Sequence, residues 1–189
     1  MELERVLRDR RSIRKFTGRP VPQDLLDSLL RKALWAPSGM NRQPWKFVVL
    51  RGSALQKLLA LSSGLAESMD EPLKAQKFND KMRSFIIGYF KNLGGAGSVV
   101  AGLSRHEESA AEDYANVLSA AAAFYNFLLL AHEAGLATCW MTGYVSVEKQ
   151  LLNLMGVQGH RLVGITPVGY PDQAPPVPPR KHEDLVWLE

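Results

Sequence analysis

The sequence has little of several residue types that would point to particular classes of protein. Among its 189 residues there is one cysteine, Cys139, so a chain cannot form an internal disulfide. The four histidines are scattered, with no pair at the helical spacing of a zinc site. They are His106, His132, His160 and His182. We therefore expect neither a disulfide framework nor a metal centre, and we place Cys139 in the core.

Long apolar runs are also lacking. The longest extends from Val117 to Ala131 and is interrupted by Ser119 and Asn126, which is short of the roughly 20 residues that a membrane span needs. Residues 1–4 (MELE) show no apolar signal region. We therefore expect a soluble protein without a membrane partner. Together with the single cysteine, this favours the cytoplasm.

The positive charge is confined to one segment. The formal net charge is +4, and residues 1–20 hold seven cations against three acids, while the remaining 16 cations and 16 acids balance. A nucleic-acid surface spreads its cations along a face and contacts many phosphates. A compact cluster suits one or two phosphates, so we expect no nucleic-acid partner.

The length and the 46% hydrophobic content allow one core, so we predict a single domain over residues 1–189. Helices and strands mix without strict βαβ alternation, which favours an α+β fold around a central sheet. The tail at about 171–189 is proline-rich and should be extended. The predicted helices start near Leu3 and Pro22 and cover Ser53–Leu61 (capped by Ser53), Glu112–Glu133 (ending at Gly135) and Ser146–Met155 (capped). The predicted strands are Lys46–Leu50, Ser98–Leu103, Ala137–Met141 and Arg161–Val168.

The helix over Glu112–Glu133 is apolar on nearly every face, so it should be buried all round. A chain of this size has limited room for such a helix. A second subunit could cover the side that the sheet leaves open, and Ala120–Ala123 would let two backbones approach closely. The alternative is a central helix of a monomer, with alanine present for helix propensity. We favour a homodimer.

Two segments within the first 45 residues carry candidate binding chemistry. Residues 10–16 (RRSIRKF) combine cations with a hydroxyl, which suits a phosphate. The alternative is a solvated helix end, where the helix dipole favours cations. Residues 36–45 (APSGMNRQPW) form a Pro/Gly turn with amide and hydroxyl groups, which suits the polar edge of a planar ring. The alternative is an ordinary helix-to-strand turn.

These two segments, with Asn126, residues 135–143 (GLATCWMTG), residues 168–171 (VGYP) and Arg180-Lys181, resemble the nitroreductase family and occur in family order. The resemblance implies a mostly antiparallel sheet flanked by helices, and a homodimer whose long buried helix lies at the interface. It implies two FMN sites at the subunit interface, each built from both chains. NADH or NADPH would reduce the flavin, which would then reduce a nitroaromatic, a quinone or a similar small acceptor by a ping-pong mechanism.

The resemblance also assigns roles to residues. It places Arg10, Ser12 and Arg180 at the phosphate, Arg14 near the ribityl chain and the pyrimidine side of the ring, and Arg11 in main-chain contacts. It assigns Pro37, Ser38, Met40 and Asn41 to the turn that reaches FMN from the neighbouring subunit, and Thr142 and Gly143 to the loop over the central ring. No catalytic side chain is needed, because the flavin carries the chemistry. A non-catalytic protein that binds or stores FMN is the alternative.

Other segments remain open or carry ordinary structure. Residues 63–97 are either a variable lid over the ring or the inner stripe of an amphipathic helix, and the second is favoured. We assign no flavin contact to Lys74, Lys77 or Lys81. Residues 94–98 (GGAGS) lack the spacing of a dinucleotide-binding loop and should be a helix end. The acidic run after His106 should be a solvated helix start.

Overall fold

The computed structural model describes residues 2–180 and 186–188. Lys181 and His182, named above, lie outside the described residues.

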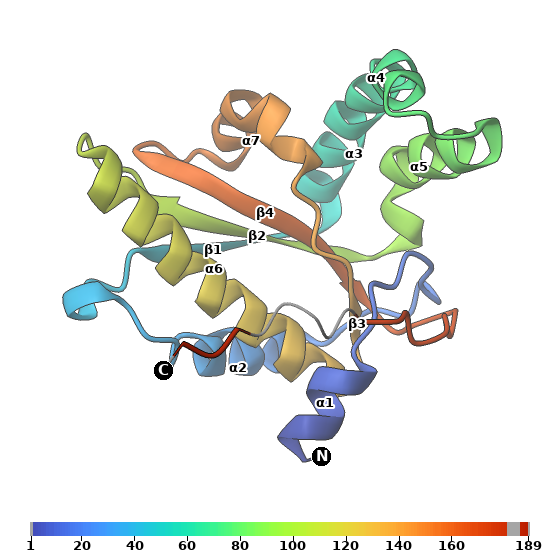
Figure 1. Ribbon diagram of the computed structural model, residues 1–189. Helices are drawn as coiled ribbons and strands as arrows, with labels where there is room; N and C mark the ends of the chain where they lie inside the picture. Colours follow the sequence, from blue (N-terminus) through green and yellow to red (C-terminus); the bar gives the residue numbers. More distant parts are fainter. Residues whose placement is uncertain (1, 181–185, 189) are drawn as a thin grey trace.

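A four-stranded sheet forms the centre of the described chain (Figure 1). Its strand order is β1-β2-β4-β3, and all neighbouring strands are antiparallel. Most of β2 and β4 is buried, as expected for strands covered on both faces. The predicted α+β fold with a mostly antiparallel sheet is confirmed. The strands are β1 (Trp45–Leu50), β2 (Ser98–Arg105), β3 (Ala137–Thr138) and β4 (His160–Gly169).

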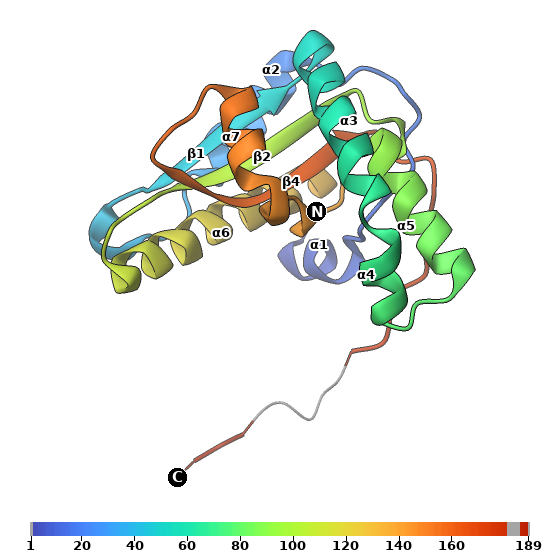
Figure 2. The same cartoon turned by 90° about the horizontal axis from the view of Figure 1, so that it is seen from above.

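Helices cover both faces of this sheet (Figures 1 and 2). α2 and α6 form one apolar core with it, and α3, α5 and α7 form the other. The α-helices are α1 (Leu3–Asp9), α2 (Gln23–Ala33), α3 (Gly52–Glu67), α4 (Asp70–Ala75), α5 (Asp80–Asn92), α6 (Ala110–Glu133) and α7 (Glu148–Met155). The short 3-10 helices are η1 (Gly39–Asn41), η2 (Leu93–Gly95) and η3 (Gly143–Val147).

The strand predicted over Ala137–Met141 is shorter than expected. After Thr138 the main chain leaves the ladder, because Cys139 N–H donates to the side-chain Oγ1 of Thr166 at 3.0 Å instead of to a backbone carbonyl. Met141 returns to β4 as an isolated bridge to Ile165. Cys139 is buried and free, in agreement with its predicted place in the core.

Neither serine predicted to cap a helix does so. Gly52 adopts a φ of +54°, which glycine tolerates, and turns the chain directly from β1 into α3. The N-cap therefore falls on Arg51, and Ser53 lies in the first turn. Ser146 lies in η3, where its hydroxyl donates to the carbonyl of Gly143 at 2.9 Å, and α7 begins only at Glu148.

The long helix α6 ends as predicted, with Gly135 just beyond it at a φ of +76°. Its inner face packs on the sheet, where Phe124 stacks on Phe47 with 6.2 Å between ring centroids. The expectation of burial on every face is wrong for a single chain. Leu118 is 53% exposed and Tyr125 is 38% exposed, because the sheet covers only one side of the helix.

By length and composition alone, α6 would be long and apolar enough to cross a membrane. The apolar run counted from the sequence did not suggest this, since it left out the first turns of the helix. The packing of α6 against the sheet is that of a core helix, and the buried residues of its inner face belong to the same core as α2.

Residues 63–97 form the end of α3, then α4, α5 and η2. Tyr89 and Phe90 are buried in the second half of α5 and meet edge to face, with ring centroids 6.4 Å apart. Met82 and Phe85, in its first half, are 45% and 52% exposed. The favoured amphipathic reading therefore holds for the end of α5, whereas its beginning leaves apolar side chains in solvent. The glycines at 94 and 95 form a helix end, as predicted.

Candidate functional site

The arginine segment leaves α1 and runs along the β3 edge of the sheet. Ser12 forms a bridge with Thr138, and Ile13 N–H donates to the Thr138 carbonyl at 2.9 Å. Ile13 and Phe16 are buried beside Ala137 and hold the segment against the body of the protein. The backbone of residues 12–16 is therefore fixed by the fold, and the cations are presented from a defined edge.

The beginning of this segment lines a cavity of about 290 Å³ at the junction of α1, the end of α6 and β3. Arg10 and Arg11 lie in its wall, and His132 joins them from the last turn of α6. The other lining residues are Asp9, Ile13, Gly135, Leu136, Ala137, Thr138, Pro171, Gln173, Ala174 and Pro175. The cavity therefore combines permanent cations with an ionisable imidazole.

The two arginines of this cavity differ in their contacts. The Arg11 guanidinium donates to the carbonyl oxygens of Arg8 and Arg10, at 2.5 and 2.7 Å. Arg11 thus donates to carbonyl groups at the C-terminal end of α1. This is the helix-end contact that was the alternative interpretation of the segment. Nε of both arginines is buried and has no hydrogen-bond partner within the described residues, but only Arg11 is held by the carbonyls of α1. Since a buried N–H without a partner is costly, Arg10 offers a donor to a ligand.

The surroundings of His132 shift the pKa of its imidazole. Burial first, and then the positive charge of Arg10, lower the pKa of the imidazole below its ordinary value of 6.5. Asp9 acts in the opposite direction, and Arg11 adds a smaller lowering effect. The ring is therefore mainly neutral at pH 7.

Arg14, the last arginine of the segment, lines a second cavity of about 220 Å³. Thr142 and Gly143, at the start of η3, form the wall contributed by the chain after β3. A Cβ on Gly143 would lie 3.0 Å from Phe90 Cζ, so a larger residue would crowd this wall. The remaining lining residues are Phe85, Ile86, Tyr89, Phe90, Cys139, Trp140 and Met141.

The aromatic wall of the second cavity comes from α5. The Arg14 guanidinium carbon lies 5.9 Å from the centroid of the Tyr89 ring, within range of a cation–π interaction. The Tyr89 hydroxyl is buried, without a hydrogen-bond partner in the described chain. Burial, with a smaller effect of Cys139, raises the pKa of Tyr89, so the phenol stays protonated at all physiological pH values.

The Pro/Gly turn lies elsewhere. Met40 is 89% exposed. The side-chain Nε2 of Gln43 donates to Oδ1 of Asn41 at 3.0 Å. Ser38 Oγ accepts from Gln43 N–H at 3.0 Å, and Pro37 is exposed. Arg42 fixes the turn to the first turn of α6 by an ion pair of 2.8 Å with Glu112.

α6 therefore separates the two predicted parts of the site. The turn lies at its beginning, near Glu112, and the first cavity lies at its end, at His132. Twenty residues of helix between these positions correspond to about 30 Å. Figure 1 shows η1 and α1 near opposite ends of α6. Within one chain, the structure brings Arg10, Arg11, Ser12, Arg14, Thr142 and Gly143 to one edge and leaves Pro37, Ser38, Met40 and Asn41 apart from them.

Arg180 lies in the extended tail, away from both cavities. It is exposed, and its guanidinium donates to the carbonyls of Pro178 and Pro179, each at 3.4 Å. An earlier part of the tail, Pro171 and 173–175, does line the first cavity. The described structure thus places the tail at the cavity but not the arginine.

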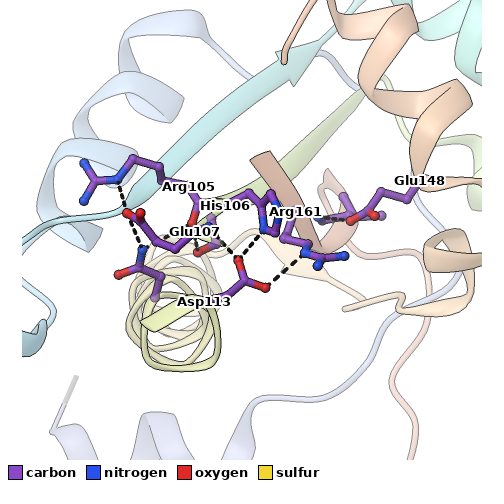
Figure 3. Close-up of polar contacts among 9 residues, drawn as sticks. Arg105, His106, Glu107, Asp113, Glu148 and Arg161 are labelled. Atoms are coloured by element: carbon purple, nitrogen blue, oxygen red, sulfur yellow. Dashed lines mark hydrogen bonds and ion pairs between the residues drawn. The ribbon is translucent and has the colours of Figure 1, made fainter. Parts of the chain in front are cut away.

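A second polar cluster lies at the start of α6 (Figure 3). Asp113 accepts hydrogen bonds from His106 Nδ1 at 2.7 Å, Glu107 N–H at 3.0 Å and Arg161 Nε at 3.1 Å. The Glu107 N–H first, then His106, lower the Asp113 pKa. The sequence predicted only a solvated helix start here. It contained no signal that Arg161, far along the chain, would join the cluster.

The fold is that of an α+β protein in which arginines of one segment line two cavities. The sequence profile of the nitroreductase family matches residues 7–170, and the chain belongs to that family.

Similar proteins cover nearly the whole chain. The Bacillus subtilis strain 168 protein YfhC, which is named for NAD(P)H nitroreductase activity, is 28% identical over 187 residues, or 94% of this chain and 89% of the relative. A nitroreductase-like protein from Bacillus cereus is 27% identical, with a TM-score of 0.79 over 100% of this chain and 97% of that one. A nitroreductase with bound FMN from Bacteroides fragilis is 22% identical, with a TM-score of 0.77 over 100% of both chains.

Proposed function

We propose that this chain is an FMN-dependent oxidoreductase that takes hydride from NADH or NADPH and reduces a small acceptor, such as a nitroaromatic or a quinone, by a ping-pong mechanism. Membership of the nitroreductase family supports the class of enzyme. YfhC is named for NAD(P)H, and the Bacteroides fragilis structure contains FMN. We also propose that it acts in the cytoplasm, without a membrane or nucleic-acid partner.

The observation that carries this proposal is the path of residues 10–14 between the two cavities. Arg10 lines one cavity and Arg14 the other, and four extended residues span about 13 Å. An elongated ligand with an anionic end and a planar end fits such an edge. The buried, unpartnered Nε of Arg10 suits the phosphate, and the absence of a side chain on Gly143 lets Phe90 pack closely against the wall of the second cavity.

The residues of the chain bind and tune the cofactor. Arg10 and Ser12 would hold the phosphate, with Arg11 keeping the end of α1 in place beside it. Bound FMN supplies the hydride chemistry. Arg14 would stabilise the negative charge that a reduced ring carries, because a fixed cation near developing charge needs no reorganisation. The Gly143 N–H would face the ring, and the aromatic wall from α5 would exclude water.

We propose a homodimer that completes the site. The outer face of α6 leaves Leu118 and Tyr125 exposed, and between them Ala121 and Ala122 are only half-buried. A two-fold axis across this face would pair two α6 helices in opposite directions. The start of one helix would then lie at the end of the other. Pro37, Ser38, Met40 and Asn41 of one chain would reach the cavities of its partner.

The test is the visible absorption spectrum of the purified protein, before and after heat release of any ligand. A yellow protein that releases about one FMN per chain supports the proposal. Anaerobic addition of NADH or NADPH should then bleach the flavin within seconds. Bound FMN that neither donor bleaches would favour the alternative, a non-catalytic FMN-binding protein. A colourless protein that does not take up added FMN would contradict both.

A further inference from the structure

We propose that His132 belongs to the phosphate end of the site and takes up a proton from solvent when the phosphate of FMN binds. This rests on the proposed function, because it places that phosphate in the cavity of Arg10.

The geometry supports His132 as a third group around one anion. It lines the same cavity of about 290 Å³ as Arg10 and Arg11, although it comes from α6, more than a hundred residues later in the chain. α1 lies beside that end of α6 (Figure 1). An arginine is charged at every pH of interest, whereas an imidazole is charged only when protonated. The cavity thus holds two permanent cations and one conditional cation, together with the Asp9 carboxylate.

The charges that face His132 come from α1 and the segment after it. Arg10 and Arg11 disfavour its protonation, and Asp9 favours it. On its own helix the neighbouring charged residue is Glu133. The other walls of the cavity, at 135–138 and at 171 and 173–175, carry no titratable side chain. The balance of these charges, together with burial, keeps the free ring mainly neutral.

A bound phosphate would reverse this balance. A phosphate monoester carries about 1.5 to 2 negative charges at pH 7. Between the arginines and the imidazole, it would offset the repulsion and attract the imidazolium, which raises the pKa of His132. A ring that is neutral in the free protein and charged in the complex gains one proton. By linkage, affinity for FMN then increases as the pH falls between the free and bound pKa values.

The experiment is a calorimetric titration of FMN into the full-length protein after removal of its flavin, with native protein and His132→Gln compared. Two buffers with different enthalpies of ionisation give the number of protons taken up at pH 7. The ionisation of the FMN phosphate itself contributes equally to both proteins, so the difference belongs to His132. His160→Gln, on β4, is the matched control, and riboflavin is the ligand without phosphate.

We expect native protein and His160→Gln to take up more protons than His132→Gln. A rise of one unit in the pKa corresponds to about tenfold in affinity. His132→Gln should therefore bind FMN about 3- to 10-fold more weakly at pH 6.5 and within about 2-fold of native at pH 8.5. Riboflavin should show no such difference.

A second measurement does not depend on how the variant folds. Histidine NMR signals of the native protein give the pKa of His132 with and without FMN, and that pKa should be higher in the complex. If FMN binds with equal proton uptake by both proteins, or leaves that pKa unchanged, the role of His132 is overturned while the proposed function stands. If native protein binds no FMN, both are overturned.

Discussion

The carbonyl oxygen of Arg14 lies against Gly94, so closely that a Cβ on Gly94 would be 2.2 Å from it. The same turn receives the Phe16 N–H on its Gly94 carbonyl at 3.0 Å. The glycine-rich helix end after α5 therefore supports the arginine segment and fixes the backbone of the arginine that lines the second cavity.

Gly94→Ala should displace Arg14 and weaken FMN binding. Gly95→Ala is the matched control, because both glycines have positive φ, of +68° and +76°, but a Cβ on Gly95 would meet only the Phe16 carbonyl at 3.9 Å. Both variants should lose roughly 1–2 kcal/mol of stability from the backbone conformation. Only Gly94→Ala should lose further stability beyond this amount, and only Gly94→Ala should raise the Kd for FMN. Thermal unfolding and FMN titration measure the two effects, and equal behaviour of the variants would contradict the role of Gly94.

Arg10→Ala should weaken FMN binding by roughly 1.5–3 kcal/mol through loss of a charge-assisted hydrogen bond to phosphate. The fold should survive, because Arg10 Nε has no partner to lose within the described chain. Arg31→Ala, whose guanidinium pairs with Asp27 on α2, is the control. Fluorescence titration with FMN measures the affinity. An unchanged Kd for Arg10→Ala would remove Arg10 from the site.

Tyr125→Glu should break the proposed dimer, because it places a charge on the outer face of α6. Val49→Glu on β1 is a matched control, since both side chains are 38% exposed. We expect sedimentation velocity to show a monomer for Tyr125→Glu and a dimer for native protein and Val49→Glu. The monomer should also bind FMN much more weakly. A native monomer loaded with FMN would refute a site built from two chains.

Stability should fall with acidification in part through Asp113. Its folded-state pKa lies below the ordinary value of 3.8, so its stabilising effect is present above that value and is lost as the pH falls through the folded-state pKa. Asp113→Asn should therefore be less stable than native protein at pH 7. The difference should narrow below about pH 4, as the pH falls from the ordinary value of 3.8 through the folded-state pKa. Urea unfolding across this range measures it, with Asp24→Asn on α2 as the control. A constant difference would contradict a carboxylate stabilised by His106, Glu107 and Arg161.

Local patterns predicted the elements of the fold but not their relations in space. The apolar periodicity of α2, the long apolar stretch of α6 and the β-branched run of β1 were sufficient, because those signals come from neighbouring residues. The predicted caps at Ser53 and Ser146 are wrong, since the turn at Gly52 and the 3-10 helix η3 set where each helix begins. The partial exposure of α6 also depends on how many sides the sheet can cover.

In the candidate site, too, the features with a local sequence signal were predictable and those that depend on packing were not. The arginine segment and Gly143 stand out in the sequence because the family motif includes them. His132 had no local signal, and Tyr89 stood out only as one of several apolar residues in the segment 63–97. Each enters a cavity because α6 or α5 packs beside residues 10–14. The resemblance, and no local pattern, assigned the Pro/Gly turn to the neighbouring subunit. Its separation from the arginines of its own chain is set by the length of α6.

The length of α6 has a genetic consequence. If each pocket takes its arginines from one chain and its Pro/Gly turn from the other, two different defects can complement each other. Mixed dimers of an Arg10→Ala chain and an Asn41→Ala chain would contain one pocket with both defects and one with none. Co-expression of two inactive variants would then restore up to half of the sites in each mixed dimer, as no repair within a single chain could.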